Sequence, residues 1–352
     1  MAVYTNIDDP SAHFQVALHS SANAATITND GNSDLQPDLI WSKARGATHN
    51  HGLYDSTRGV TKFLSTNNTS AETTASSGFD LTSFNTDGFS TGNNQYNTIC
   101  GGTTYVAWQW KANGGTTSTN TDGDINSTVQ VNADAGFSIV TDSPTNNTAR
   151  SIGHGLGVAP QVVIRRARTR VENWRVFHSA AGSTGAFILD NASAYNSSTV
   201  LFTGVTSTTF GVGTDFSVNG NYSYVSYCFA EKQGYSKFGK YVGNGTNNNG
   251  PFIYTGFKPR FIMIKSTTNT GSTVMWDSKR SPFNGMDDYL VAAEADAEGT
   301  NGIFTIDAVS NGFKIRNTGA NNGLNQSGTK YIYYAFAENP FVTSTGIPTT
   351  AR

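Results

Sequence analysis

The sequence predicts an all-β chain made of three tandem homologous antiparallel β-sandwich domains of the jelly-roll or lectin-like kind. Two observations lead to this expectation. A strand-turn-strand pattern occurs three times along the 352 residues, each time introduced by a proline and closed by an aromatic strand. Glycine is abundant, with 37 residues, whereas only 14% of the residues are charged. Such a composition favours short strands joined by tight turns.

The first element of each copy is a strand that follows a proline. Residues 37–43 read PDLIWSK, residues 160–166 read PQVVIRR and residues 259–265 read PRFIMIK. The second to fourth positions after the proline are apolar in each copy, so we expect both faces of these strands to be buried. Seventeen positions after each proline comes an aromatic residue, which is Tyr54, Phe177 or Trp276. This spacing predicts a second strand that folds back on the first.

Two polar positions recur in this pair of strands. The sixth position after the proline is Lys43, Arg166 or Lys265, and the eighteenth is Asp55, His178 or Asp277. A second strand folded back on the first would bring the two positions close together. We interpret them as a cross-strand charge pair at a strand end. The alternative is an acid–base pair with a functional role.

Each copy closes on a strand rich in aromatic residues. Residues 105–110 read YVAWQW, residues 224–229 read YVSYCF and residues 331–336 read YIYYAF. Alternate positions place a large apolar face on one side of each strand, which is typical of a central strand in a sheet. A helical pattern occurs only at residues 287–298. The expected core aromatic residues are Trp41, Trp108, Trp110, Phe229, Trp276 and Phe336.

The repeats set the expected domain boundaries. The first repeat covers residues 1–112, the second residues 131–231 and the third residues 232–341. Residues 113–130, which are mostly Gly, Thr, Ser, Asn and Asp, read as a linker. Residues 342–352 form a polar C-terminal tail that is free to dock on a neighbour.

Bulk properties exclude several classes of protein. The net charge of −2 argues against a nucleic-acid-binding protein. Cys100 and Cys228 occupy non-matching positions in different copies, so we expect both to be unpaired. The N-terminus resembles no signal peptide, and the apolar runs are too short for a transmembrane helix. We therefore expect a protein that is made in a cytoplasm and does not insert into a membrane.

Sequence motifs for chemistry are weak. His49 and His51 form a His-x-His pair, which we interpret as a solvated loop and not as a metal site because no third ligand is evident. Asp122 and Asp124 imitate only the first half of a calcium loop. We expect no catalytic residues, no cofactor and no metal. A carbohydrate-active enzyme remains an alternative, since glycoside hydrolysis needs only two carboxylates.

Loops that differ in length and content between the copies are the expected recognition surface, because loops on a rigid scaffold usually carry recognition. These loops contain the residues that we select as candidates. They are His49, His51, Asn244, Asn247, Asn249, Asn321 and Asn322.

Several stretches resemble a family of marine tailed-phage virion proteins that carry a repeated, uncharacterised β domain. The stretches are IDDPSAHF at residues 7–14, YVAWQWKANGG at 105–115, GHGLGVAP at 153–160 and YIYYAFAENPF at 331–341. The resemblance implies a virion-associated protein and carries over no catalytic residues.

Together these observations predict a surface structural protein of a phage virion, without enzymatic activity. We expect a tail-associated host-recognition fibre or adhesin, and the alternative is a capsid decoration or head-fibre protein. The expected partners are other virion proteins, further copies of the chain in a homo-oligomer, and a host surface polysaccharide or receptor. Neither nucleic acid nor membrane insertion is expected.

Overall fold

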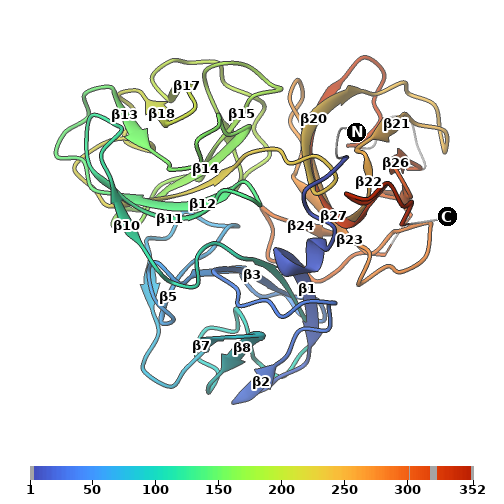
Figure 1. Ribbon diagram of the computed structural model, residues 1–352, viewed down its shortest axis with the longest axis horizontal. Helices are drawn as coiled ribbons and strands as arrows, with labels where there is room; N and C mark the ends of the chain where they lie inside the picture. Colours follow the sequence, from blue (N-terminus) through green and yellow to red (C-terminus); the bar gives the residue numbers. More distant parts are fainter. Residues whose placement is uncertain (1–3, 301, 318–322, 350–352) are drawn as a thin grey trace.

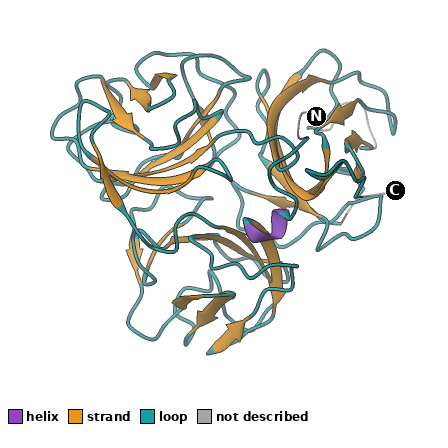
Figure 2. Cartoon of the chain, in the orientation of Figure 1, coloured by secondary structure: helices purple, strands orange, loops and turns teal. Residues whose placement is uncertain are grey.

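Strands gathered into three lobes around a common centre make up the protein (Figures 1 and 2). The computed structural model describes residues 4–300, 302–317 and 323–349. A short 3-10 turn, η1 (Pro10–Ala12), precedes the first strand, and the regular elements that follow it are strands. Each lobe holds one large and one small antiparallel sheet. The predicted all-β class is therefore confirmed.

The first lobe has a large sheet in the order β1-β9-β3-β4-β5-β6 and a small sheet in the order β2-β8-β7. Its strands are β1 (Phe14–His19), β2 (Ala25–Ile27), β3 (Leu39–Ala44), β4 (Gly52–Asp55), β5 (Lys62–Leu64), β6 (Thr73–Thr74), β7 (Leu81–Asn85), β8 (Gly88–Thr91) and β9 (Tyr105–Trp110).

The second lobe has the orders β10-β11-β12-β19-β14-β15-β16 and β13-β18-β17. Its strands are β10 (Ser118–Asn120), β11 (Ser127–Asn132), β12 (Phe137–Asp142), β13 (Arg150–Gly153), β14 (Val162–Ala167), β15 (Arg175–His178), β16 (Phe187–Ile188), β17 (Phe202–Val205), β18 (Thr209–Val212) and β19 (Tyr224–Phe229).

The third lobe has the orders β20-β27-β22-β23-β24 and β21-β26-β25. Its strands are β20 (Ser236–Val242), β21 (Phe252–Tyr254), β22 (Phe257–Ser266), β23 (Val274–Asp277), β24 (Leu290–Val291), β25 (Ile306–Val309), β26 (Gly312–Ile315) and β27 (Lys330–Pro340).

The strands that follow the three prolines are equivalent by register. The residue two positions after each proline pairs with the same place in the closing strand, as Leu39 with Trp110, Val162 with Phe229 and Phe261 with Phe336. The aromatic residue at the seventeenth position also pairs with the same place, as Tyr54 with Ile40, Phe177 with Val163 and Trp276 with Ile262. The predicted repeat of this strand pair is confirmed.

The central strands of the large sheets are buried on both faces. One face packs on the small sheet of the same lobe, so each lobe has its own apolar cluster. The other face turns to the middle of the molecule, where all three large sheets share a single core. Trp110, Phe229 and Phe336 occupy equivalent positions there, and their ring centroids lie 5.5 to 6.1 Å apart. All six predicted core aromatic residues are buried.

Three expectations about individual segments need comment. The stretch 113–130 is not a free linker, because it contains β10 and the start of β11, which extend the large sheet of the second lobe through β12. Residues 287–298 are not helical, because β24 and the loop after it bind the first lobe instead. The two cysteines are buried and free, as predicted.

The C-terminal tail docks on its own chain over the part that the structure describes. Val342 bridges to Pro348, and the backbone N–H of Ser344 donates to the carboxylate of Asp8 at 2.6 Å. Residues up to Thr349 are therefore held against the N-terminal segment and are not free to reach a neighbour.

We predict that Phe336→Ala destabilises the whole molecule, because the ring is 4% exposed and stands at the centre of the shared core. Loss of such a ring costs about 3–5 kcal/mol of unfolding free energy, which urea denaturation would measure. Phe283→Ala is the matched control, since Phe283 is 78% exposed and its truncation should change stability by less than about 0.5 kcal/mol. Equal stability of the two variants would contradict the central core.

Candidate functional site

The residue eighteen positions after each proline lies at a junction between lobes. Asp55 of the first lobe accepts a hydrogen bond from the Tyr227 hydroxyl of the second at 2.7 Å. Asp277 of the third lobe accepts one from the Trp108 indole N–H of the first at 3.0 Å. Equivalent positions thus face the next lobe in a cycle, although His178 of the second lobe reaches the third by a different bond, in which it donates to the Tyr333 carbonyl.

The basic residue six positions after each proline also crosses a junction, in the opposite sense around the cycle. Lys43 Nζ donates to the Ala295 carbonyl at 3.0 Å, and Lys265 Nζ donates to the Asn191 carbonyl at 3.1 Å. Arg166 donates to the Ser70 carbonyl at 2.7 Å. Burial lowers the pKa of both lysines to about 8. Each cation therefore binds a backbone carbonyl of the neighbouring lobe.

Neither interpretation of these two positions as a pair is correct. The second strand does fold back on the first, but Asp55 lies opposite Leu39 and not opposite Lys43. Asp55 instead forms an ion pair with Arg58, and Asp277 forms one with Arg280. The sequence spacing correctly predicted that the second strand folds back on the first. It did not predict the partners of the charged side chains, because these depend on contacts with the neighbouring lobe.

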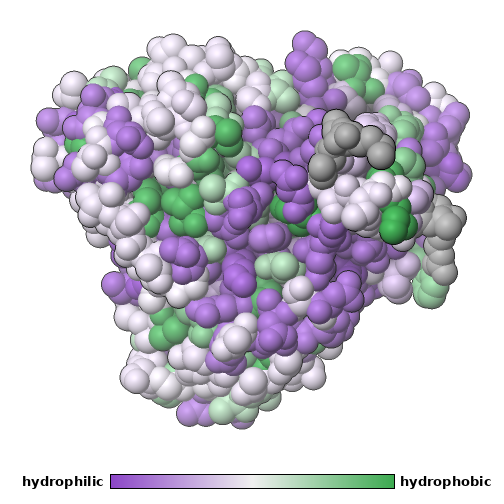
Figure 3. All heavy atoms as spheres, viewed as in Figure 1, coloured by the Kyte–Doolittle hydropathy of each residue, from purple (hydrophilic) through white to green (hydrophobic). Residues whose placement is uncertain are grey.

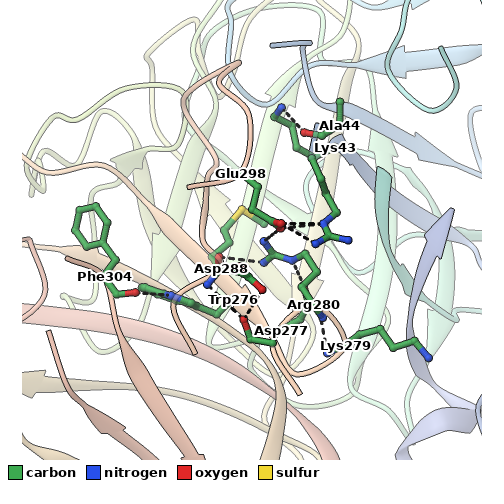
Figure 4. Close-up of polar contacts among 12 residues, drawn as sticks. Lys43, Ala44, Trp276, Asp277, Lys279, Arg280, Asp288, Glu298 and Phe304 are labelled. Carbon is green, nitrogen blue, oxygen red and sulfur yellow. Dashed lines mark hydrogen bonds and ion pairs between the residues drawn. The ribbon is translucent and has the colours of Figure 1, made fainter. Parts of the chain in front are cut away.

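Two junctions contain the same chain of four charged side chains. Between the third and first lobes, Asp277 binds Arg280, which donates to Glu298 at 2.8 Å, and Glu298 binds Arg45 (Figure 4). Burial alone would raise the pKa of Glu298, but hydrogen bonds and charge from Arg45 and Arg280 hold it below its ordinary value. Glu298 is therefore an ionised partner of the two arginines and is not poised to exchange protons at neutral pH.

The first and second lobes meet through the equivalent chain of Asp55, Arg58, Glu72 and Arg168. The junction between the second and third lobes lacks it, because His178, Ala181 and Thr267 stand at the positions of the aspartate and the two arginines. His178 donates to the Tyr333 carbonyl at 3.3 Å, and its ring meets Tyr334 edge-on. This junction therefore lacks the chain of ion pairs that the other two contain.

His51 is a junction residue and not part of a solvated recognition loop. Its Nδ1 accepts from the Trp41 indole N–H at 2.9 Å, and its Nε2 donates to the Glu294 carbonyl at 3.0 Å. The side chain is fully buried, and burial lowers its pKa to about 3. His49, two residues earlier, is only half-buried. Within the described residues, His, Cys, Asp and Glu side chains form no group of three that could hold a metal ion.

The asparagine-rich loop at residues 243–250 stays a candidate. Asn244, Asn247 and Asn249 are exposed. Asn325, which lies in the expected recognition loop at residues 317–327, is buried below the loop at 243–250 and exchanges two hydrogen bonds of 2.9 Å with Asn244. The loop is thereby held in one conformation. Asn321 and Asn322 lie outside the described residues.

A second candidate surface, also missed from the sequence, lies on the second lobe. The Arg170 guanidinium stacks on Phe216 and on Tyr222, 5.2 and 5.0 Å from the ring centroids, and donates to the Tyr222 hydroxyl at 2.8 Å. Phe216 is 47% exposed and Val171 is 65% exposed. We call Arg170, Val171, Phe216 and Tyr222 the aromatic–arginine cluster.

The sequence signal that could have located this cluster is the difference in loops between copies. Its residues come from 168–173 and 213–223, and neither loop matches its counterparts in the other two lobes. On the face shown in Figure 3, hydrophobic residues occur in small groups, and hydrophilic ones gather where the lobes meet. The cluster therefore combines an exposed aromatic ring with a fixed hydrogen-bond donor.

We predict that stability falls as the pH drops from 7 to 5. Burial lowers the pKa of His51 to about 3 and that of His178 to about 4, and both Nδ1 atoms already accept an N–H. The unfolded chain, with a histidine pKa of about 6.5, takes up protons that the folded chain refuses. The two residues together should cost about 4 kcal/mol between these pH values.

Urea denaturation at the two pH values would measure this loss. In His178→Gln the loss should be smaller by about 2 kcal/mol, the share of one ring, while His19, whose pKa burial also lowers to about 4, should contribute equally in both proteins. A wild-type protein with the same unfolding free energy at pH 5 and pH 7 would show that the two rings are not held neutral.

Comparison with known proteins identifies one matching family. The helical part of the described chain contains nothing long and apolar enough to cross a membrane. No curated protein and no solved structure matches the chain. A family model described as a domain of unknown function matches residues 9–340. Since this match covers the three lobes from η1 to β27, the chain belongs to the DUF7483 family.

Proposed function

We propose that the protein is a non-enzymatic recognition protein of a phage virion surface, and specifically a host-recognition adhesin. The observation that carries this proposal is the aromatic–arginine cluster. It presents a half-exposed Phe216 ring beside Arg170, which is fixed by its stacking and by its bond to Tyr222. The resemblance to marine tailed-phage virion proteins supplies the virion context.

The ligand class that suits this cluster is a surface polysaccharide. The exposed face of an aromatic ring packs against the C–H groups of a sugar, and a fixed guanidinium donates hydrogen bonds to hydroxyls or carboxylates. The exposed asparagine-rich loop at residues 243–250, which contains Asn244 and Asn249, offers a second polar surface on the third lobe. Each contact is weak, so useful affinity requires many copies on one particle.

The junction chemistry supports binding over catalysis. Asp55, Asp277, Glu72 and Glu298 each bind an arginine of their own lobe at a junction. Glu72 and Glu298 also bind an arginine of the neighbouring lobe. The buried histidines are likewise engaged on both ring nitrogens. Groups that an acid–base mechanism would use are thus committed to holding the lobes together. A carbohydrate-active enzyme is accordingly the weakest of the three candidates.

We further propose that each lobe is one copy of a duplicated β-sandwich domain of the jelly-roll or lectin-like kind, with the boundaries 1–112, 131–231 and 232–341. In each lobe the chain alternates between two sheets. Counted from β1, β12 and β20, the large sheet holds the first, last and third strands side by side, and the small sheet holds the second beside the penultimate. Alternation of this kind is what two Greek keys produce in a jelly roll.

A capsid decoration or head-fibre protein is the second candidate. The observation that favours it is the compact three-lobed body, which has no elongated shaft among the residues that the structure describes (Figure 1). A module of this shape suits docking on other virion proteins, as a single chain or as a homo-oligomer.

We predict that Phe216→Ser weakens binding to host surface polysaccharide about tenfold per site, the loss expected for one aromatic stacking contact. Titration of the purified protein with polysaccharide from the host would measure it. The matched control is Phe283→Ser, which removes an even more exposed ring from the third lobe and should leave binding unchanged.

Particles that carry Phe216→Ser separate the two main candidates. Normal assembly with loss of adsorption to host cells supports the adhesin. Particles that lose the protein or fail to assemble favour the decoration role. Hydrolysis of the polysaccharide by the purified protein would overturn both.

A further inference from the structure

The first strands of the three lobes have different neighbours on their outer edges. In the second lobe, β12 pairs with β19 on one side and with β11 on the other. In the third lobe, the equivalent strand β20 pairs only with β27 and stands at the edge of its sheet. The chain therefore covers this edge in one lobe and leaves it bare in another.

Hydrogen-bond alternation identifies the bare groups of β20. The Ala337 N–H donates to the Tyr235 carbonyl, so every second residue from Tyr235 onward is bonded to β27. The backbone N–H and C=O of Phe238 and Lys240 must then point away from β27. No described residue binds them. The corresponding groups of Ile139 and Thr141 in β12 face Gln130 and Thr128 of β11.

Space for a further strand lies beside β20, at the junction that lacks the charged chain. A cleft of about 430 Å³ lies between the second and third lobes, lined by Lys240 together with residues 179–184 and 203–205. Its wall includes Ala181, at the position that Arg58 and Arg280 fill in the other copies. The gap beside β1, the equivalent strand of the first lobe, is only about 30 Å³ and is closed by residues such as Arg260 and Glu338.

We infer that β20 is a strand-addition site, which binds an extended segment of a different protein antiparallel to Phe238–Lys240. The chain itself provides the template, since β11 occupies the same place on β12. Its sequence STVQVN, at residues 127–132, alternates polar and apolar side chains. Main-chain hydrogen bonds give such a contact its affinity.

Charge points to the chemistry of the partner. Lys240 is exposed in the cleft and forms no ion pair with a described residue, and Val242 beyond it is 53% exposed. The added strand should therefore carry a carboxylate opposite Lys240 and an apolar residue next to Val242. A second copy of β20 does not meet this requirement, because its sequence SKFGKYV contains no carboxylate to place opposite Lys240. The inference holds whether or not the protein is an adhesin.

The probe is a peptide with the sequence of residues 126–133 of this chain, added to the intact protein and followed by hydrogen–deuterium exchange. At about ten times its Kd the peptide should slow exchange of the Phe238 and Lys240 amides about tenfold. The same peptide with Thr128→Glu places a carboxylate opposite Lys240. It should bind up to about fivefold more tightly.

Proline variants test the edge directly. Lys240→Pro removes an N–H that β27 does not use, so it should abolish peptide binding and leave the Tm unchanged. Thr141→Pro is the matched control, because the equivalent N–H is bonded to β11, and its Tm should fall. Slow exchange of both β20 amides in the free monomer, or unchanged peptide binding by Lys240→Pro, would overturn the inference. Protection that appears only on self-association would also overturn it by placing a second copy at this edge.

Discussion

The shared core at the centre of the molecule is the constraint on which the rest of the structure depends. Each large sheet must bury its second face, and it does so only against the other two. Trp110, Phe229 and Phe336 come from equivalent strands and touch one another at this point. Because the three sheets converge there, no lobe can lose its neighbours without exposing several aromatic rings, each of which buries about 150–250 Å². Folding of the three lobes is therefore coupled.

The charged chains between lobes follow from this arrangement. Sheets that meet at an axis bring their strand ends together, so Asp55 and Asp277 reach the aromatic residues of the next lobe. Buried ion pairs add little net stability, because desolvation offsets their attraction, but removal of one member leaves a buried charge without a partner. We therefore regard these chains as a means of fixing how the lobes fit, with stability supplied by the aromatic centre.

The sequence predicted the parts of the fold that depend on local pattern. The strand pair after each proline, the seventeen-residue spacing and the buried closing strands all appear in the structure, since alternation and proline position are local properties. Local sequence pattern did not predict the contacts between lobes. The sequence predicts that His51 lies in a solvated loop. In the structure, the carbonyls of Val291 and Glu294 in the third lobe accept hydrogen bonds from its ring. The same contacts draw residues 287–298 out of the helix that their composition favours, because tertiary contacts override propensity.

Differences between the copies matter more for function than their likeness. The sheet faces that form the shared core are alike because all three sheets meet at one axis with the same geometry. Residues at these positions are explained by packing alone. Departures occur at the periphery, where Arg170 meets Phe216 and Tyr222, and at the one junction where Ala181 replaces an arginine. A duplicated scaffold can change these places with little effect on the axis, since the aromatic–arginine cluster lies outside the shared core and Ala181 packs against it only as a partly buried residue. The proposed recognition surface at the aromatic–arginine cluster and the proposed strand-addition site at β20 can therefore lie on the same rigid body without competing.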